Sequence, residues 1–217
     1  MRKGESIGLG DLVRFQYVLC LDTEFTCWEN SQRDSWPDPD FPAEILQIGI
    51  AVYDNTTKNT VSEYVSFVQP VLNRELSNYC KNLLRLSQQT IDQACSLPVI
   101  VTEIENYLLD YKPENSCLCS FGPDLIQISE DTTRQGLSDP FEQFAWLNLQ
   151  SEASKVLSLV GELPERIDVR SALGLTESLH RHEALDDARD VKLILDPLHR
   201  VYSENYFLMD RTKFCPI

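Results

Sequence analysis

An apolar run that ends in two acidic residues restricts the fold of this chain more than any other feature. Residues 17–21 read Tyr-Val-Leu-Cys-Leu, and Asp22, Thr23 and Glu24 follow directly. Such a run predicts a buried strand that emerges at the edge of a sheet. Because side chains alternate along a strand, Asp22 and Glu24 point to the same face, with Cα atoms roughly 6.5 Å apart. Two carboxylates this close repel each other unless they are protonated or bridged by a cation such as Mg²⁺ or Mn²⁺. A solvated acidic strand end is the simpler alternative.

The length and charge of the chain limit its architecture and its partners. We expect one domain over residues 1–217, with a core at about 15–203, because no internal repeat or domain boundary divides the sequence. Nineteen basic and thirty-four acidic residues give a formal net charge of −15. This charge argues against broad, non-specific adhesion to duplex DNA or to anionic membranes. A narrow nucleic-acid site whose acids are neutralised by bound metal is compatible with it.

The amino terminus and the cysteines indicate the cellular compartment of the protein. Residues 1–10 carry two positive charges with no apolar run behind them, and no apolar segment of the chain approaches 18 residues. We therefore expect a soluble, cytoplasmic protein with no membrane partner. The seven cysteines contain no C-x-x-C pair, and most lie in apolar runs, so we expect reduced thiols in the core.

The remaining pattern predicts an α/β domain with a mixed sheet flanked by helices. Residues 45–53 and 60–68 are rich in β-branched and aromatic residues and enclose a turn, which indicates a hairpin. A further short strand is expected at 117–121. Residues 141–149 are compatible with a strand or a helix, and a strand at 144–147 is favoured. A proline-rich loop is expected at 29–42. Helical spacing of apolar residues predicts helices at 76–86, 87–95, 98–109, 152–160, 168–175 and 184–201, and one that starts at Pro123.

Two more groups of residues are positioned to meet the acidic pair. Asp124 follows the strand predicted at 117–121, at the strand end where open α/β sheets bind ligands. His182 and Asp187 would not share a face of one helix, but a helix that starts near Ala184 leaves His182 in a loop that can bend back. Two divalent ions about 4 Å apart, held by carboxylates, can stabilise the attacking and leaving oxygens of a phosphodiester. A nearby histidine can accept the proton of the attacking water. An acid in a first helical turn and a surface histidine are the simpler alternatives.

Taken in order, these motifs resemble those of the DEDDh 3′-to-5′ exonucleases. The resemblance covers roughly residues 15–200 and is closer to the branch that trims small interfering RNA, histone messenger RNA and ribosomal RNA ends. The three exonuclease motifs are Asp22-Thr23-Glu24, Ser120-Phe121-Gly122 with Asp124, and His182 with Asp187 in H-x-A-L-D-D-A. The branch is suggested by Glu44-Ile45-Leu46-Gln47-Ile48-Gly49 and by Leu76-Ser77-Asn78-Tyr79-Cys80 followed by Ser87-Gln88.

The resemblance implies a ribonuclease H-like fold and a metal-dependent exonuclease. His182 would be the general base, and nucleoside 5′-monophosphates would leave the 3′ end of RNA, with DNA as a less favoured substrate. Phe121 stands where the family usually has tryptophan, a position compatible with stacking on a terminal base and with a place in the core. The implied ligands of two Mg²⁺ or Mn²⁺ ions are Asp22, Glu24, Asp124 and Asp187. The implied substrate-binding residues are Thr23, Phe25 and Phe121.

The chain also departs from the family pattern. One residue instead of two separates Gly122 from Asp124, and residues 83–86, Leu-Leu-Arg-Leu, lack the glycine of the family's Leu-Thr-Gly-Ile segment. The charge of −15 fits poorly with a processive enzyme on long RNA and favours short or single-stranded ends as substrates. The altered second motif and this charge also motivate the alternative of a catalytically weak binding or adaptor module. A third reading, which takes Asp187 and its acidic neighbours as the diphosphate site of an all-helical prenyl-transferring enzyme, conflicts with the predicted strands.

Overall fold

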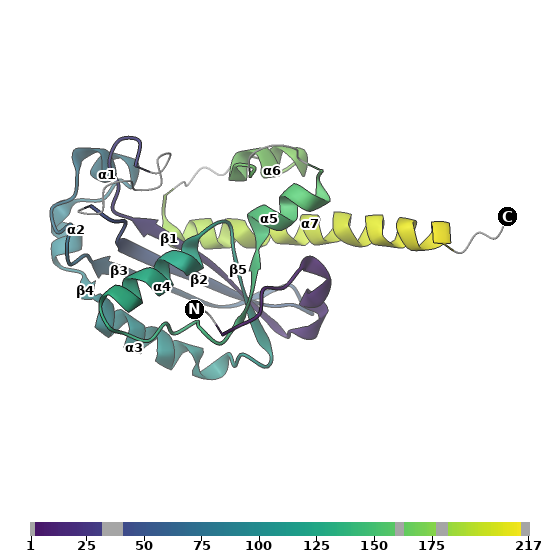
Figure 1. The fold of residues 1–217 in the computed structure, drawn as a ribbon, viewed down its shortest axis with the longest axis horizontal. Coiled ribbons are helices and arrows are strands. Elements are labelled where there is room, and N and C mark those ends of the chain that lie inside the picture. Colours follow the sequence, from purple (N-terminus) through teal and green to yellow (C-terminus); the bar gives the residue numbers. More distant parts are fainter. Residues whose placement is uncertain (1–2, 32–40, 159–162, 177–181, 214–217) are drawn as a thin grey trace.

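A mixed sheet forms the centre of the protein (Figure 1). The computed structural model describes residues 3–31, 41–158, 163–176 and 182–213. Within these residues the sheet has six strands in the order β4-β3-β2-β1-β5-β6. The strands are β1 (Tyr17–Phe25), β2 (Ile45–Asp54), β3 (Thr60–Gln69), β4 (Cys95–Ser96), β5 (Ser116–Ser120) and β6 (Ala145–Asn148). Strand β1 is antiparallel to β2 and parallel to β5, which confirms the predicted mixed sheet.

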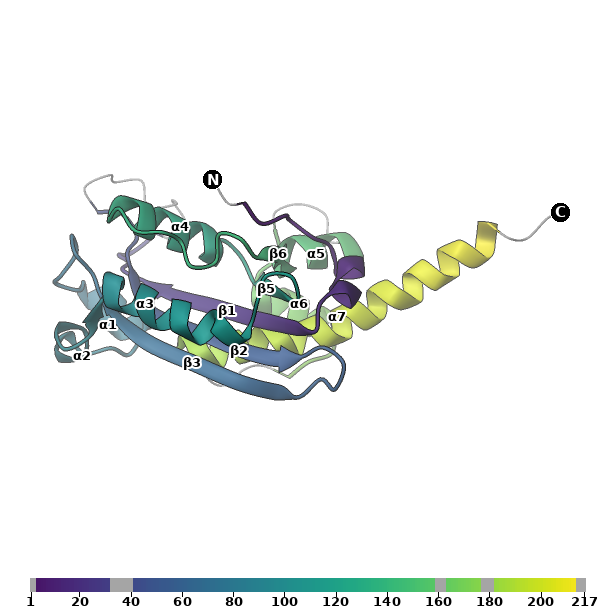
Figure 2. The same ribbon diagram turned by 90° about the horizontal axis from the view of Figure 1, so that it is seen from below.

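Helices cover both faces of this sheet (Figures 1 and 2). Helices α3 and α4 pack on one face, whereas α5 and α7 pack on the other. The α-helices are α1 (Asn78–Leu83), α2 (Gln88–Asp92), α3 (Leu97–Tyr107), α4 (Asp124–Arg134), α5 (Leu149–Val156), α6 (Arg166–Ala172) and α7 (Ala184–Lys213). Two 3₁₀ helices are η1 (Leu9–Arg14) and η2 (Leu108–Asp110). None of the helices in these described ranges combines the length and the apolarity needed to cross a bilayer.

The predicted elements agree in kind with the structure and differ mainly at their ends. Strand β1 continues to Phe25 because its acidic end still pairs with β2. Helix α7 continues past the end predicted at residue 201, since helical hydrogen bonds are local and do not need an apolar stripe. Helix η1 and the two-residue strand β4 were not predicted. Several predictions fall outside the described residues: the loop at 32–40, the end of the helix at 152–160, His180 and Cys215.

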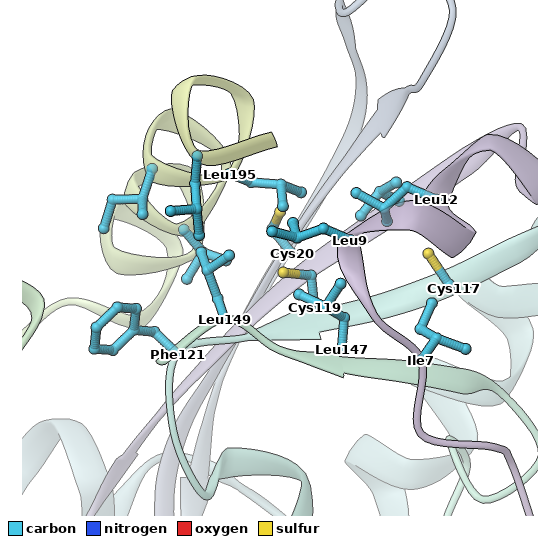
Figure 3. Packing of buried hydrophobic residues seen from close by; sticks show 14 of the residues in the cluster. Ile7, Leu9, Leu12, Cys20, Cys117, Cys119, Phe121, Leu147, Leu149 and Leu195 are labelled. Carbon is cyan, nitrogen blue, oxygen red and sulfur yellow. The ribbon is translucent and has the colours of Figure 1, made fainter. Parts of the chain in front are cut away.

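Strand β1 separates two hydrophobic cores. Leu19 and Leu21 face α3 and α4, whereas Val18 and Cys20 face α5 and α7. Figure 3 shows the second of these cores, in which side chains of β1 and β5 lie near Leu195 of α7. The six cysteines in the described part of the chain are free, and five of them are buried, which confirms the predicted core thiols for these residues. Because both faces of β1 are buried, the acidic residues at its end have a rigid support.

Residues Gln47 and Gly49 of β2 position the start of α7. Gly49 pairs with Asp22 in the sheet register, and a Cβ atom at Gly49 would overlap the backbone of Ala184. The absence of a side chain therefore allows α7 to begin directly against the sheet. Gln47 then fixes that approach: its Oε1 accepts a hydrogen bond from Ala184 N at 3.0 Å, and its Nε2 donates to Glu183 at 3.1 Å.

Glu44, in the same motif, fixes the chain that follows β3. Its side chain is buried, and its two carboxylate oxygens accept hydrogen bonds of 2.6–3.1 Å from backbone N–H groups. The donors are Val71, Leu72 and Asn73. The segment Glu44–Gly49 thus has a structural role at both of its ends.

We expect Gly49→Ala to destabilise the protein. The added methyl group would meet backbone atoms of Ala184, which cannot move without shifting α7, and such overpacking costs about 1–3 kcal/mol. Urea denaturation measures the change in the free energy of unfolding. Gly8→Ala is the matched control, because the nearest atom to its methyl group would be a Glu152 carboxylate oxygen at 3.4 Å, which is an ordinary van der Waals contact. Equal stability of the two variants would show that α7 does not depend on close approach at Gly49.

Candidate active site

Three carboxylates from two distant segments meet at the end of β1. Asp22, Glu24 and Asp187 each offer one oxygen, and these oxygens lie within 4.8 Å of one another. The three side chains are only 6–7% exposed. Asp22 and Glu24 arrive on one face of β1, as alternation along the strand predicted, and Asp187 comes from the first turn of α7. The packing of α7 against β2 at Gly49 brings Asp187 to this place.

Asp124 reaches the same end of the sheet from the other side of β1. It is the first residue of α4 and is buried. Its Oδ1 accepts hydrogen bonds from the backbone N–H of Thr23 at 3.0 Å and from the Thr23 hydroxyl at 2.8 Å. Gly122 has a φ of 126°, a conformation that L-residues rarely adopt, and this allows the short connection from β5. Among the described residues, the group of oxygens within 4.8 Å does not include Asp124, so it lies beside that group.

His182 lies in the loop that precedes α7, with a φ of 67°. Its backbone N–H donates to Oδ2 of Asp187 at 3.1 Å, so the loop bends back over the start of the helix as the spacing predicted. The residue lines a cavity of about 420 Å³ that also includes the three clustered carboxylates. A histidine is therefore placed in the cavity that contains the acidic group.

Two arginines that sequence reasoning missed line the same cavity. The Arg166 guanidinium contacts Oδ1 of Asp22 at 2.5 Å and Oδ1 of Asp187 at 3.0 Å. Arg170, one turn further along α6, forms an ion pair with Asp190 and donates to a backbone carbonyl in the segment that follows α6. The sequence spacing could have indicated this pairing of α6 with α7. The two arginines are four residues apart, and Asp187 and Asp190 of α7 are three apart, so each pair shares one face of its helix.

Burial dominates the electrostatics of the acidic group. It raises the pKa of Asp22 well above the ordinary value, against the opposing effect of the Arg166 charge. Burial likewise raises the pKa of Glu24, and the neighbouring charge of Asp22 adds to the effect. The pKa of Asp124 is raised by burial although the hydrogen bonds from Thr23 act in the opposite direction. These carboxyl groups therefore favour a bound proton or a cation over an isolated negative charge.

The predicted substrate-binding residues lie in different surroundings. Thr23 lines the cavity and donates to Asp124. Phe25 is partly buried against the core on the α3 and α4 side of the sheet. Phe121 is 8% exposed and belongs to the opposite core (Figure 3), where the Arg166 guanidinium carbon lies 5.5 Å from its ring centroid. Of the two readings of Phe121, this position agrees with a place in the core.

The residues of the acidic group fit a divalent cation. Its donors are carboxylate oxygens alone, which are the ligands that hard cations such as Mg²⁺ and Mn²⁺ prefer. Their burial and mutual repulsion would be relieved by a bound positive charge. The cluster of Asp22, Glu24 and Asp187 can therefore hold a metal ion.

The fold and the acidic group are similar to those of exonucleases with a ribonuclease H-like fold, and comparisons with known proteins agree. Residues 19–123 match the family model described as an exonuclease. The 3′–5′ exonuclease eri1 of Schizosaccharomyces pombe is 28% identical over 131 residues, which cover 60% of this chain and 40% of that protein. The 3′–5′ exonuclease crn-4 of Caenorhabditis elegans is 25% identical over 195 residues, which cover 83% of this chain and 62% of that protein. The chain thus spans less than two thirds of the length of either relative.

Solved structures show the same fold. The nuclease domain of 3′hExo, a DEDDh family member bound to rAMP, has a TM-score of 0.74 and 20% sequence identity, and the match covers 88% of this chain and 93% of that chain. Cell-death related nuclease 4 has a TM-score of 0.68 and 20% identity, over 88% of this chain and 65% of that chain. Residues 19–123 thus match an exonuclease family, and the chain has the fold of a solved DEDDh family member, as the resemblance predicts.

We expect Glu24→Gln to stabilise the protein in the presence of a chelator at neutral pH. An acid whose pKa is raised on folding destabilises the folded state wherever it is ionised there, by about 1.4 kcal/mol for each pH unit that separates its folded and unfolded pKa values. The effect is full above the raised pKa and disappears as the pH falls below the ordinary value of 4.5, because the native glutamic acid then binds a proton as well. Urea denaturation between pH 4 and 8 measures it. The exposed control Glu105→Gln should change the free energy of unfolding by less than about 0.5 kcal/mol at every pH.

Proposed function

We propose that this chain is a metal-dependent 3′-to-5′ exonuclease that hydrolyses phosphodiester bonds at RNA 3′ ends and releases nucleoside 5′-monophosphates. The observation that carries the proposal is the meeting of Asp22, Glu24 and Asp187 with His182 in one cavity. These residues come from segments about 160 positions apart in the sequence. The exonuclease domain at residues 19–123 and the similarity to named 3′–5′ exonucleases support the same reaction.

The mechanism follows from the positions of the side chains. Asp22, Glu24 and Asp187 would hold two divalent cations, Mg²⁺ or Mn²⁺, with Asp124 as the fourth carboxylate. When bound, the cations supply the positive charge that stabilises the attacking and leaving oxygens of the phosphodiester. The His182 imidazole accepts the proton of the attacking water. The hydrogen bond from the His182 backbone N–H to Asp187 holds this residue next to the acidic group.

The substrate class is inferred from relatives and from the charge of the chain. Among the similar structures is a 3′-exonuclease described by its 3′-end specific recognition of a histone mRNA stem-loop, and the 3′hExo domain was solved with rAMP. More distant similar structures include exonuclease I of E. coli with single-stranded DNA. The net charge of −15 disfavours extended contact with a long nucleic acid. We infer that single-stranded or short RNA 3′ ends are preferred and that DNA is a weaker substrate.

A catalytically weak binding or adaptor module is the second candidate. The shortened second motif and the negative charge motivate it. The hydrogen bonds between Asp124 and Thr23 favour the enzyme, because the shortened motif still delivers its aspartate to the end of β1. Calorimetric titration separates the candidates: an enzyme of this class should bind two Mn²⁺ ions, whereas a module without a competent site need not bind a pair of metals and would leave a 3′-labelled oligonucleotide uncut.

We expect Asp22→Ala and His182→Ala each to lower the Mn²⁺-dependent release of mononucleotides by at least about 100-fold. The first removes a carboxylate of the acidic group and the second removes the proton acceptor. A 3′-labelled RNA with separation of the products measures the rate, and circular dichroism verifies the fold. His199→Ala is the matched control, because His199 lies on the same α7 but against Tyr202. Activity that survives both active-site substitutions would refute the proposed function.

The preference between substrates is tested with matched 3′-labelled oligonucleotides of RNA and DNA, single-stranded and double-stranded, with Mg²⁺ or Mn²⁺. We expect single-stranded RNA to be cut fastest and every productive combination to yield 5′-monophosphates. A faster reaction on DNA would leave the chemistry intact and overturn the inferred substrate class.

A further inference from the structure

We propose that Arg166 binds the phosphate of the substrate at this site. In doing so, its guanidinium breaks its ion pairs with Asp22 and Asp187, and these carboxylates then bind the divalent cations. The inference rests on the exonuclease activity proposed above. It assigns to α6 a role in substrate binding that the three sequence motifs do not contain.

The guanidinium of Arg166 contacts the same carboxylates that can hold a metal ion. It lies 2.5 Å from Oδ1 of Asp22 and 3.0 Å from Oδ1 of Asp187. Both aspartates belong to the group of oxygens within 4.8 Å of one another. A divalent cation held by this group would meet the positive charge of the guanidinium at a distance where like charges repel strongly. Arg166 and the cations therefore compete for Asp22 and Asp187.

Helix α6 remains in place when the Arg166 side chain moves. Arg170, on the same helix, is buried in an ion pair with Asp190 of α7. The chain before α6 is held by Gln150, whose Nε2 donates to the carbonyl of Pro164 at 3.1 Å. With the backbone fixed on both sides, displacement of the guanidinium is a change of rotamer within the cavity that Arg166 lines.

The charge balance of the site with two bound cations explains why the guanidinium would remain in the cavity. Four ionised carboxylates, Asp22, Glu24, Asp124 and Asp187, balance two divalent cations. The guanidinium then leaves a net charge of +1, which one phosphodiester neutralises. Arginine suits this task because its planar fork donates two parallel hydrogen bonds to phosphate oxygens. The ring of Phe121 lies on the core side of the guanidinium, 5.5 Å from its carbon, and stabilises its positive charge by a cation–π interaction.

A purely structural counter-ion would behave differently. If Arg166 only neutralised the acidic group, its removal would lower the stability of the fold. The affinities for nucleotide and for metal would then change in the same direction. The proposal predicts changes of opposite sign: without the guanidinium, the carboxylates bind cations more tightly and the site binds phosphate more weakly. Partial unfolding cannot produce this pattern, because it weakens both.

The experiment compares Arg166→Gln and Arg166→Lys with the native protein. Calorimetry first measures Mn²⁺ binding to each protein, and then the binding of 5′-AMP, the product that the proposed reaction releases from RNA, to the Mn²⁺-loaded proteins. We expect Arg166→Gln to bind Mn²⁺ several-fold more tightly and 5′-AMP about tenfold more weakly, with a similar rise in KM for a 3′-labelled RNA. Arg189→Gln is the control, because Arg189 pairs with Glu63 and Asp186 outside the cavity. It should change none of these values by more than about twofold.

Arg166→Lys keeps the comparison valid if Arg166→Gln does not fold. Lysine retains the charge and loses the planar fork, so 5′-AMP binding should weaken while Mn²⁺ affinity stays within about twofold. Unchanged 5′-AMP affinity in the folded variants, or weaker Mn²⁺ binding by Arg166→Gln, would overturn the role of Arg166 while the native protein still cuts RNA. A native protein that neither binds Mn²⁺ nor cuts would instead overturn the proposed function and this inference with it.

Discussion

Asp22, Glu24 and Asp187 are held together against their mutual repulsion by packing that forms elsewhere in the molecule. Burial and the neighbouring carboxylates raise the pKa of Asp22 and of Glu24, and this cost opposes folding. The opposing contribution comes from the two cores on either side of β1, where fully buried side chains fix the strand. The Arg166 guanidinium neutralises part of the charge within the site itself. The position of the acidic group is thus a property of the whole sheet and of α7.

Close contact between β2 and α7 is the second requirement. Asp187 reaches Asp22 because a glycine stands opposite Asp22 in the sheet and leaves room for the helix backbone. Gln47 adds two hydrogen bonds at the same place. The motif that suggests the family branch therefore acts through geometry: it sets how near the helix start comes to the sheet.

The sequence predicted the residues whose positions depend on local periodicity. Alternation along β1 put Asp22 and Glu24 on one face, and the start of a helix near Ala184 put His182 in the preceding loop. Arg166 and Arg170 were missed because their partners lie on another helix, and the pairing of α6 with α7 depends on tertiary packing. The sequence also left two readings of Phe121 open, since the burial of a side chain at a strand end depends on the elements that cover it.

Helix α7 combines two different constraints along its length. Its first turns carry Asp187 and its middle is buried against β1 and β2, with Ala188, Val191 and Leu198 inaccessible to solvent. Its carboxyl-terminal turns extend beyond the sheet (Figure 1). Substitutions in the first turns or the middle would therefore disturb the acidic group or the core, whereas the turns beyond the sheet are held by the backbone hydrogen bonds of the helix. The position of Asp187 is thus set by the part of α7 that lies against the sheet, and it does not require the full length of the helix.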